Sequence, residues 1–195
     1  MNSAPSPSAA PGVGDPLVDV LGLIPDAVLD LRYAGARNLL GRPVYARPRA
    51  LLRLSVARRV AAAAAALRAR GLRLVVYDAY RPLSVQRLLW AARPDPRWVA
   101  DPARGSLHNR GAAIDAALAD SRGRALEMPC DFDEFGPSAR HGADGVQERA
   151  AEHARTLRAA MEAEGLSALE DEWWHYGDER LRDAPPLDAA LEDIP

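Results

Sequence analysis

Two short segments hold most of the groups in this chain that could bind a metal ion, and a fold that uses them as one site must bring them together. They read SLHNRGAAID (residues 106–115) and EWWH (residues 172–175), and the second segment begins 57 positions after the first ends. Together they offer two imidazoles, one carboxylate seven residues after the first imidazole, and a glutamate beside the second. Three protein ligands, an open fourth position and a nearby carboxylate that is not a ligand are the components of a catalytic zinc site. With only four histidines and one cysteine in the chain, few other metal sites could be built from it.

The spacing within the first segment is physically suited to a shared site. Gly111 lies between His108 and Asp115, and glycine allows the backbone to turn so that a loop residue and a strand residue can face one point. Asp115 stands among alanines and Ile114, and a carboxylate in an apolar strand is costly unless it is paired or bound to a metal. A single histidine is more often a hydrogen-bonded structural residue, so it is the combined pattern that favours a metal site.

Both segments, with a third around Arg81, resemble the zinc D-alanyl-D-alanine dipeptidases of the vancomycin-resistance type. These enzymes form part of peptidase family M15 and share a fold with the hedgehog signalling domain. Their pattern Ser-x-His-x-x-Gly-x-Ala-x-Asp, followed by Glu-x-Trp-His, is matched here without departure. The sequence YDAYRP (residues 77–82) is similar to the family's Asp-x-Tyr-Arg-Pro. The resemblance covers roughly residues 28 to 180.

The resemblance implies a role for five residues. His108, Asp115 and His175 would bind one Zn²⁺ per chain. Glu172 would act as general base and then general acid, taking a proton from zinc-activated water and passing one to the leaving amine. Arg81 would stabilise the oxyanion of the tetrahedral intermediate, a role suited to a guanidinium because it is always charged and offers several donors.

Two further residues would hold the ends of the substrate. Ser106 is expected to bind the carboxylate, and Asp133 the free ammonium group. A buried carboxylate that faces an ammonium explains how a dipeptidase rejects longer peptides, since extension at the amino end removes the charge. Asp131 and Glu134 are close neighbours and alternative partners. The segment MPCD (residues 128–131) departs from the more common Met-Gly-Thr/Ser-x of the family.

Two of these residues also have ordinary structural interpretations. Arg81 taken alone could form a surface salt bridge with Asp78, because the chain holds 25 basic residues. Glu172 could be an exposed acid that continues the run of Glu170 and Asp171. The motif around each residue favours the catalytic interpretation.

Apolar periodicity and turn residues predict an α+β fold. Short antiparallel strand runs with helices segregated among them are typical of this class, and the resemblance implies one hedgehog/D,D-peptidase-like domain with helices packed on a central, mainly antiparallel sheet. We expect an N-terminal disordered tail over residues 1–18, the zinc D,D-dipeptidase domain over 19–182 and a loosely packed C-terminal tail over 183–195. The main predicted helices are 49–70, 82–93 and 145–164, and the main strands are 72–77, 112–118 and 173–177.

Composition limits the partners and the location. A formal net charge of −2 gives no electrostatic reason to bind nucleic acid or an anionic membrane. No stretch reaches the roughly 18–20 apolar residues of a membrane span, and residues 1–14 lack the basic and apolar regions of a signal peptide. The lone Cys130 cannot form an internal disulfide. We therefore expect a cytoplasmic protein with no obligate protein partner, and the resemblance implies a small dipeptide as its substrate.

Three functions fit these observations to different degrees. The leading prediction is zinc-dependent hydrolysis of D-Ala-D-Ala to two D-alanines, a reaction connected with cell-wall peptidoglycan and with vancomycin resistance. The second is a D,D-carboxypeptidase or L,D-endopeptidase acting on muropeptides, which the absence of an export signal and the presence of Asp133 disfavour. The third is a non-catalytic zinc-binding module, which the presence of Glu172 and Arg81 disfavours.

Overall fold

A five-stranded sheet forms the centre of the computed structural model, which describes residues 14–195. The strand order is β2-β4-β5-β7-β6; β2 pairs with β4 in parallel and every other neighbouring pair is antiparallel. The predicted α+β class with a mainly antiparallel central sheet is therefore confirmed. The strands are β2 (Val28–Leu29), β4 (Leu72–Asp78), β5 (Ala113–Asp120), β6 (Ser167–Leu169) and β7 (Glu172–Gly177).

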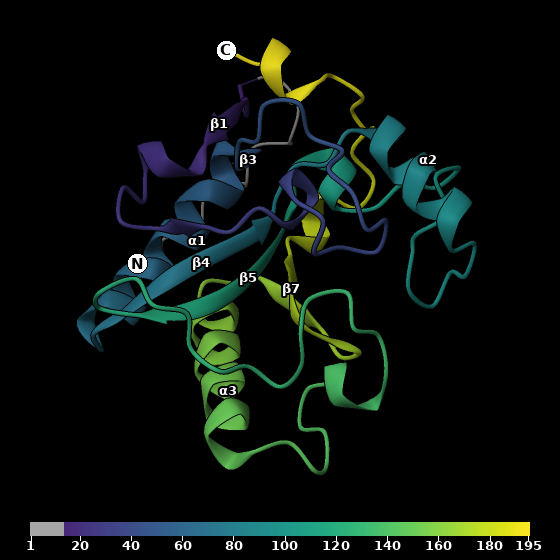
Figure 1. The fold of residues 1–195 in the computed structure, drawn as a ribbon. Helices are drawn as coiled ribbons and strands as arrows, with labels where there is room; N and C mark the ends of the chain where they lie inside the picture. The colour runs from purple at the N-terminus through teal and green to yellow at the C-terminus, as the bar shows by residue number, and fades with distance from the viewer. Residues whose placement is uncertain (1–13) are drawn as a thin grey trace, which may run out of the picture.

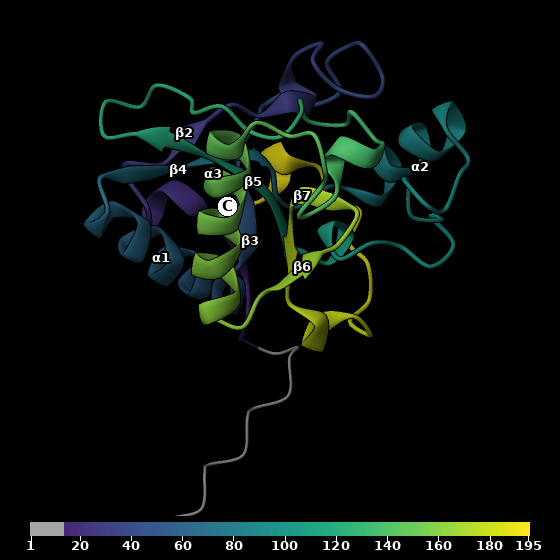
Figure 2. The same ribbon diagram turned by 90° about the horizontal axis from the view of Figure 1, so that it is seen from below.

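Two of the three α-helices within residues 14–195 cover one face of the sheet. The helices are α1 (Leu54–Ala69), α2 (Leu83–Ala92) and α3 (Glu148–Ala163). Helices α1 and α3 contact each other and the central strands, whereas α2 lies apart beyond the opposite side (Figures 1 and 2). The open face of the sheet is thus left to loops, and this is the face that carries the candidate site.

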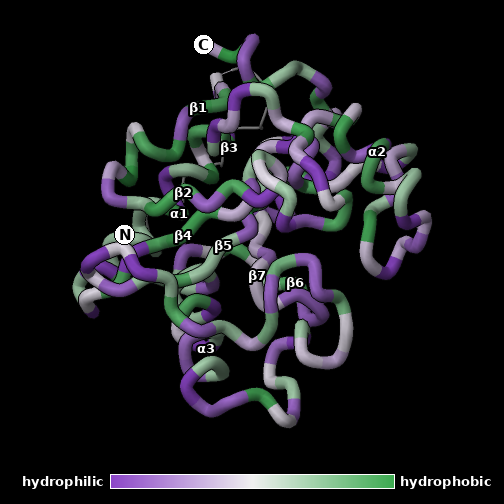
Figure 3. The backbone as a smooth tube through the Cα atoms, in the orientation of Figure 1, coloured by the Kyte–Doolittle hydropathy of each residue, from purple (hydrophilic) through white to green (hydrophobic). Residues whose placement is uncertain are grey.

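Side chains alternate between the two faces of the sheet along each central strand, and this alternation decides which of them reach the open face. Val76 of β4 and Ala116 of β5 pack in the cluster under α1 and α3, while Val75 and Ala117 belong to a second cluster on the opposite side. Successive strand residues point to opposite faces, so Asp115 points away from the two helices. Figure 3 shows hydrophobic residues along β4 and β5, which agrees with their burial from both sides.

The first helix begins later than its sequence suggests. We expected a helix from residue 49, but Leu51–Arg53 form strand β3, which pairs antiparallel with β1 (Leu17–Asp19), and α1 begins at Leu54. Leu51 and Leu52 are both fully buried, on opposite sides of the strand. Tertiary burial on two sides therefore overrides helix propensity at this position.

Both predicted tails need correction. Residues 1–13 of the expected N-terminal tail lie outside the described residues, but Leu17 and Val18 pair with β3, so the folded part begins before residue 19. The C-terminal segment is packed rather than loose: Leu191 is 2% exposed and the backbone N–H of Leu187 donates to the Asn109 carbonyl at 2.7 Å. Two apolar side chains at 187 and 191 contact the second core cluster, which the acidic and proline-rich composition of this segment concealed.

Three predicted strands are present as β4, β5 and β7, and the short β6 was not predicted. Within residues 14–195, no helix combines the length and the apolar character that crossing a membrane requires.

Candidate metal centre and substrate cavity

The three predicted metal ligands converge from three elements. His108 begins a 3-10 turn (His108–Arg110) that ends at Gly111, where φ is +65°. This left-handed backbone is the conformation that glycine adopts without a Cβ penalty, and it leads the chain directly into β5. Asp115 on β5 lies opposite His175 on β7 in the antiparallel register, which places their side chains together.

The ligand atoms fit a bound divalent cation. His108 Nε2 lies 3.1 Å from His175 Nδ1 and 3.3 Å from Asp115 Oδ1, and His175 Nδ1 lies 3.0 Å from the same oxygen. His108 Nδ1 donates a hydrogen bond to the Ala79 carbonyl at 2.7 Å, which fixes the tautomer and leaves the Nε2 lone pair free to bind a metal. Within the described part of the chain, these residues form the one His, Cys, Asp and Glu group with this convergence.

The electrostatics of the trio support the same interpretation. Burial alone would raise the pKa of Asp115, but His108 and His175 outweigh burial and hold that pKa well below its ordinary value. Burial would lower the pKa of His175, and Asp115 raises it above its ordinary value instead. Asp115 therefore stays ionised, as a metal ligand must.

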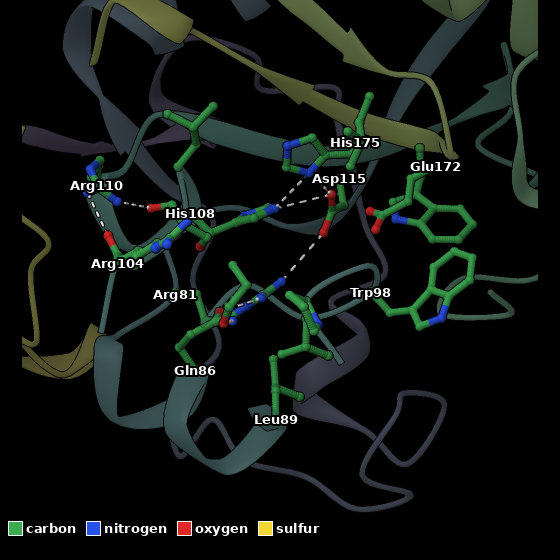
Figure 4. Close-up of a pocket in the computed structure, with 18 of the residues that line it drawn as sticks. Arg81, Gln86, Leu89, Trp98, Arg104, His108, Arg110, Asp115, Glu172 and His175 are labelled. Atoms are coloured by element: carbon green, nitrogen blue, oxygen red, sulfur yellow. Dashed lines mark hydrogen bonds and ion pairs between the residues drawn. The ribbon is translucent and has the colours of Figure 1, made fainter. Parts of the chain in front are cut away.

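Glu172 is the first residue of β7 and is 9% exposed. Burial is the main reason why the pKa of Glu172 rises to about 8, and the nearby Asp115 and Asp133 add to this effect. His175 and Arg81 act in the opposite direction. Figure 4 shows the Glu172 side chain beside the predicted metal ligands Asp115 and His175, in the cavity. Its position and its pKa near neutrality suit a group that accepts and returns a proton.

Arg81 follows β4, and its guanidinium is held from three sides. Its Nε donates to Asp78 Oδ2 at 2.9 Å, its Nη1 donates to Gln86 Oε1 at 2.9 Å, and its Cζ lies 4.9 Å above the ring of Tyr33. Its Nη2 lies 3.7 Å from Asp115 Oδ2. The salt bridge with Asp78 that we considered as an alternative does exist, but it is buried and the guanidinium also lines the cavity.

The cavity has a volume of about 610 Å³ and is lined by charged side chains of both signs. In Figure 4, Arg104 and Arg110 lie at one end, Glu172 lies toward the other, and His108 lies between them. Arg110 donates hydrogen bonds to the carbonyl groups of Ala184, Ser106 and Arg104, and within residues 14–195 it has no carboxylate within 4.0 Å. Asp183 also lines the cavity and acts on Arg110 at longer range.

Ser106 lines the cavity next to Arg110, whose Nη1 donates to the Ser106 carbonyl at 2.8 Å. Its backbone N–H donates to Asn109 Oδ1 at 2.8 Å, and its hydroxyl donates to the same oxygen at 3.2 Å. Asn109 is fully buried and donates from Nδ2 to the Arg81 carbonyl at 2.8 Å. Asn109 therefore links the position of Ser106 to that of Arg81.

Asp133 lines the cavity, whereas its two alternatives do not. Asp133 Oδ2 accepts hydrogen bonds from the Tyr33 hydroxyl at 3.1 Å and from the Leu39 N–H at 2.9 Å. Burial raises the pKa of Asp133 to about 6. Asp131 instead pairs with an arginine outside the cavity, and Glu134 Oε2 accepts from the Asp131 N–H at 3.0 Å. The structure thus brings Asp133 together with the other predicted site residues.

Sequence reasoning missed the residues that hold the predicted ones in place. These residues share no sequence motif. Each forms a hydrogen bond that becomes possible only when the fold brings its partner close, as with the Gln86 side-chain amide on α2 and Arg81. Tyr33 and Tyr45 bound a turn-rich segment, residues 33–45, that is similar to the family's Tyr-Ala-x-x-x-Asn-x-x-Gly-x-x-Val-Tyr. Asn109 and Arg110 lie inside the first motif, at positions that the family pattern leaves open. Gln86 gave no signal. The missed residues are Tyr33, Tyr45, Gln86, Asn109 and Arg110.

Comparison with known proteins agrees with the geometry. A family model described as D-Ala-D-Ala dipeptidase, Peptidase M15, matches residues 15–189. A D-alanyl-D-alanine dipeptidase of Escherichia coli K12 is 38% identical over 160 residues, covering 82% of this chain and 83% of the relative. A D-alanyl-D-alanine dipeptidase of Enterococcus faecalis V583 is 31% identical over 177 residues, which covers 80% of this chain and 86% of the relative. Among solved structures, an LD-carboxypeptidase aligns at 18% identity over 95% of this chain and 82% of its own, with a TM-score of 0.46.

Proposed function

The chain belongs to the D-Ala-D-Ala dipeptidase family of M15 peptidases, and from this premise we propose that it hydrolyses D-Ala-D-Ala to two D-alanines with one divalent metal ion. The observation that carries the proposal is that one cavity holds the convergent trio His108, Asp115 and His175 together with Glu172 and Arg81. Membership of a peptidase family and the presence of both catalytic candidates oppose a non-catalytic role.

The donor set favours zinc. Two imidazoles and one carboxylate, with His108 held by a backbone carbonyl on its other nitrogen, are typical of a catalytic Zn²⁺ site with an open position. When bound, the ion supplies positive charge that acidifies water and polarises a peptide carbonyl.

The chain's own residues then supply proton transfer and charge stabilisation. Glu172 takes a proton from water and delivers it to the amino nitrogen of the departing D-alanine. Arg81 offers the N–H groups that Asp78 and Gln86 do not occupy to the negative charge that develops on the carbonyl oxygen. Because Asp78 and Gln86 fix the guanidinium before the substrate arrives, little reorganisation is needed during the reaction.

The two ends of the cavity match the two ends of a free dipeptide. Asp133 pairs with the ammonium group, and Ser106 holds the carboxylate at the end where Arg104 and Arg110 supply positive charge. A substrate with a blocked amino group leaves Asp133 buried without a partner, which opposes binding. A cytoplasmic location and a role in vancomycin resistance stay predictions from the sequence.

A cavity of about 610 Å³ is within the range of sites for ligands larger than a dipeptide, so a D,D-carboxypeptidase is the second candidate. D-alanine release by the zinc-loaded protein from D-Ala-D-Ala and from N-acetyl-D-Ala-D-Ala, measured in parallel, separates the two. We expect release from the free dipeptide alone. Release from the blocked peptide at a comparable rate would show a carboxypeptidase, and release from neither would contradict both candidates.

A further inference from the structure

We propose that Arg32 is a positioning residue that sets the selectivity of the cavity for a free amino group. The inference rests on the proposed pairing of Asp133 with the substrate's ammonium. Arg32 does not line the cavity and does not touch the substrate site itself. It acts through the turn of residues 131–134, which carries Asp133.

That turn has an unusual backbone. Asp133 has a φ of +61°, and within residues 14–195 it is the one residue other than glycine with a positive φ. Aspartate tolerates the left-handed region better than most residues, but such a conformation persists only where surrounding contacts hold it. The contacts around this turn therefore decide where the carboxylate points.

One oxygen of Asp133 is held while the other is free for a ligand. Oδ2 accepts hydrogen bonds from Tyr33 and from the Leu39 N–H, and among the described residues Oδ1 has no hydrogen-bond partner within the protein. Tyr33 remains protonated as a donor, because burial and the nearby Asp133 raise the pKa of Tyr33 well above its ordinary value. A small rotation of the turn would move Oδ1 away from an ammonium in the cavity.

Arg32 connects this turn to the rigid sheet. Its side chain is 5% exposed, its Cζ lies 4.0 Å from the ring centroid of Tyr77 on β4, and its Nη1 donates to Asp131 Oδ1 at 2.7 Å. Its Nε lies 3.0 Å from Asp30 Oδ2, although the N–H is not aligned for a hydrogen bond. Arg32 is thus fixed against the central sheet and holds the residue two positions before Asp133.

A neighbouring arginine provides a matched control. Arg37 Nη2 contacts the same Asp30 oxygen at 2.8 Å, but its side chain is 64% exposed and it forms no ion pair with Asp131. The two arginines therefore share an acidic partner and differ in whether they reach the turn. A substitution at each changes the net charge equally.

Removal of the Arg32–Asp131 ion pair should weaken only ligands that carry an ammonium. The pair joins a buried guanidinium to a carboxylate that is 59% exposed, and pairs of this kind are worth up to about 1 kcal/mol, or about five-fold in affinity. Ligands without the amino group do not use Asp133 and should be unaffected.

The experiment measures inhibition constants of two compounds, a phosphinate analogue of D-Ala-D-Ala and its des-amino counterpart, with the zinc-loaded full-length protein. We expect Arg32→Met and Asp131→Asn each to weaken the amino compound about five-fold and to leave the des-amino compound unchanged. Arg37→Met should change neither. The Arg32→Met/Asp131→Asn double variant should be no weaker than either single variant, because both remove one interaction.

Other outcomes overturn the inference. Equal weakening of both compounds by Arg32→Met would make Arg32 a general scaffold residue, as would an equal effect of Arg37→Met. If Arg32→Met does not fold, Asp131→Asn at its half-exposed position still tests the pair. Equal binding of both compounds by the wild type would remove the ammonium role of Asp133, and the inference with it, while D-alanine release would still test the proposed function separately.

Discussion

The proposed metal centre and the proposed amino-group pocket share one cavity but are built in different ways. Asp115 and His175 occupy paired positions on neighbouring strands, so the sheet's own hydrogen bonds set their separation. Asp133 lies on a loop and is held by residues 94 and 100 positions earlier in the chain, through one backbone N–H and one hydroxyl. On the proposed roles, catalysis depends on the rigid sheet, whereas selectivity for the amino group depends on a few weak contacts that can change without disturbing the proposed metal ligands.

The largest effect is expected where the sheet itself supplies a ligand. Asp115→Asn removes the anionic ligand between two imidazoles and should abolish metal binding and D-alanine release together, because a neutral amide is a much weaker ligand for a divalent ion. Metal content after dialysis and activity are the measurements. Retention of stoichiometric zinc with full activity would remove Asp115 from the metal centre.

Glu172→Gln should separate chemistry from metal binding. Glutamine keeps the shape of the side chain but cannot accept the proton, so we expect kcat to fall by about 10²–10⁴ while zinc content stays at one per chain. The measurements are steady-state kinetics with D-Ala-D-Ala and metal analysis. Near wild-type turnover would show that another group moves the proton.

Arg81→Lys tests whether the held guanidinium stabilises the transition state. Lysine keeps the charge but not the fork that Asp78 and Gln86 orient, so we expect kcat to fall by about 10²–10³ with little change in KM. A rise in KM without loss of kcat would instead indicate that Arg81 binds the ground state.

Asp133→Asn should have the opposite effect: it should weaken the selectivity for a free amino group and leave the catalytic step unchanged. Asparagine also tolerates a left-handed backbone, so the turn should be retained while the charge is lost. We expect KM for D-Ala-D-Ala to rise by about 10–100-fold with kcat and zinc content nearly unchanged. In the wild type, KM should also rise as pH falls below about 6, because protonated Asp133 cannot pair with an ammonium. An unchanged KM in the variant would transfer the amino-group role elsewhere.

The smallest effect concerns stability in the absence of substrate. The folded-state pKa of Asp133, about 6, is above the ordinary 3.8. Its contribution to stability is therefore fully present below about pH 4 and is lost as pH rises through about 6. The free energy of unfolding of Asp133→Asn near pH 7.5 should consequently exceed that of the wild type by up to about 3 kcal/mol, and the difference should shrink toward pH 4. Denaturant titrations at both pH values measure it; a variant that is less stable at pH 7.5 would contradict the cost of burying this carboxylate.

The features that could be predicted are those that depend on residue type and on spacing within a short segment. Gly111 between His108 and Asp115 implied the turn, and the structure places glycine there with a left-handed backbone. The β-rich runs around residues 72–77 and 112–118 became the two central strands because their apolar residues satisfy both faces of the sheet. The start of α1 and the C-terminal segment were predicted wrongly, since burial of Leu51, Leu52 and Leu191 depends on partners distant in the chain.

By itself the sequence predicted the central strands from apolar periodicity, and its short motifs, through their resemblance to the family pattern, predicted the metal ligands and the roles of Glu172 and Arg81. Only the tertiary structure decided that Asp133, and not its neighbours Asp131 and Glu134, lines the cavity. It also brought Tyr33 and Leu39 to Asp133, and Arg32 to Asp131 in the same turn. The physical reason is that a turn has no periodic pattern of its own. Its direction is the result of hydrogen bonds and ion pairs formed across about 100 residues of chain, and these exist only once the sheet has brought the two segments together.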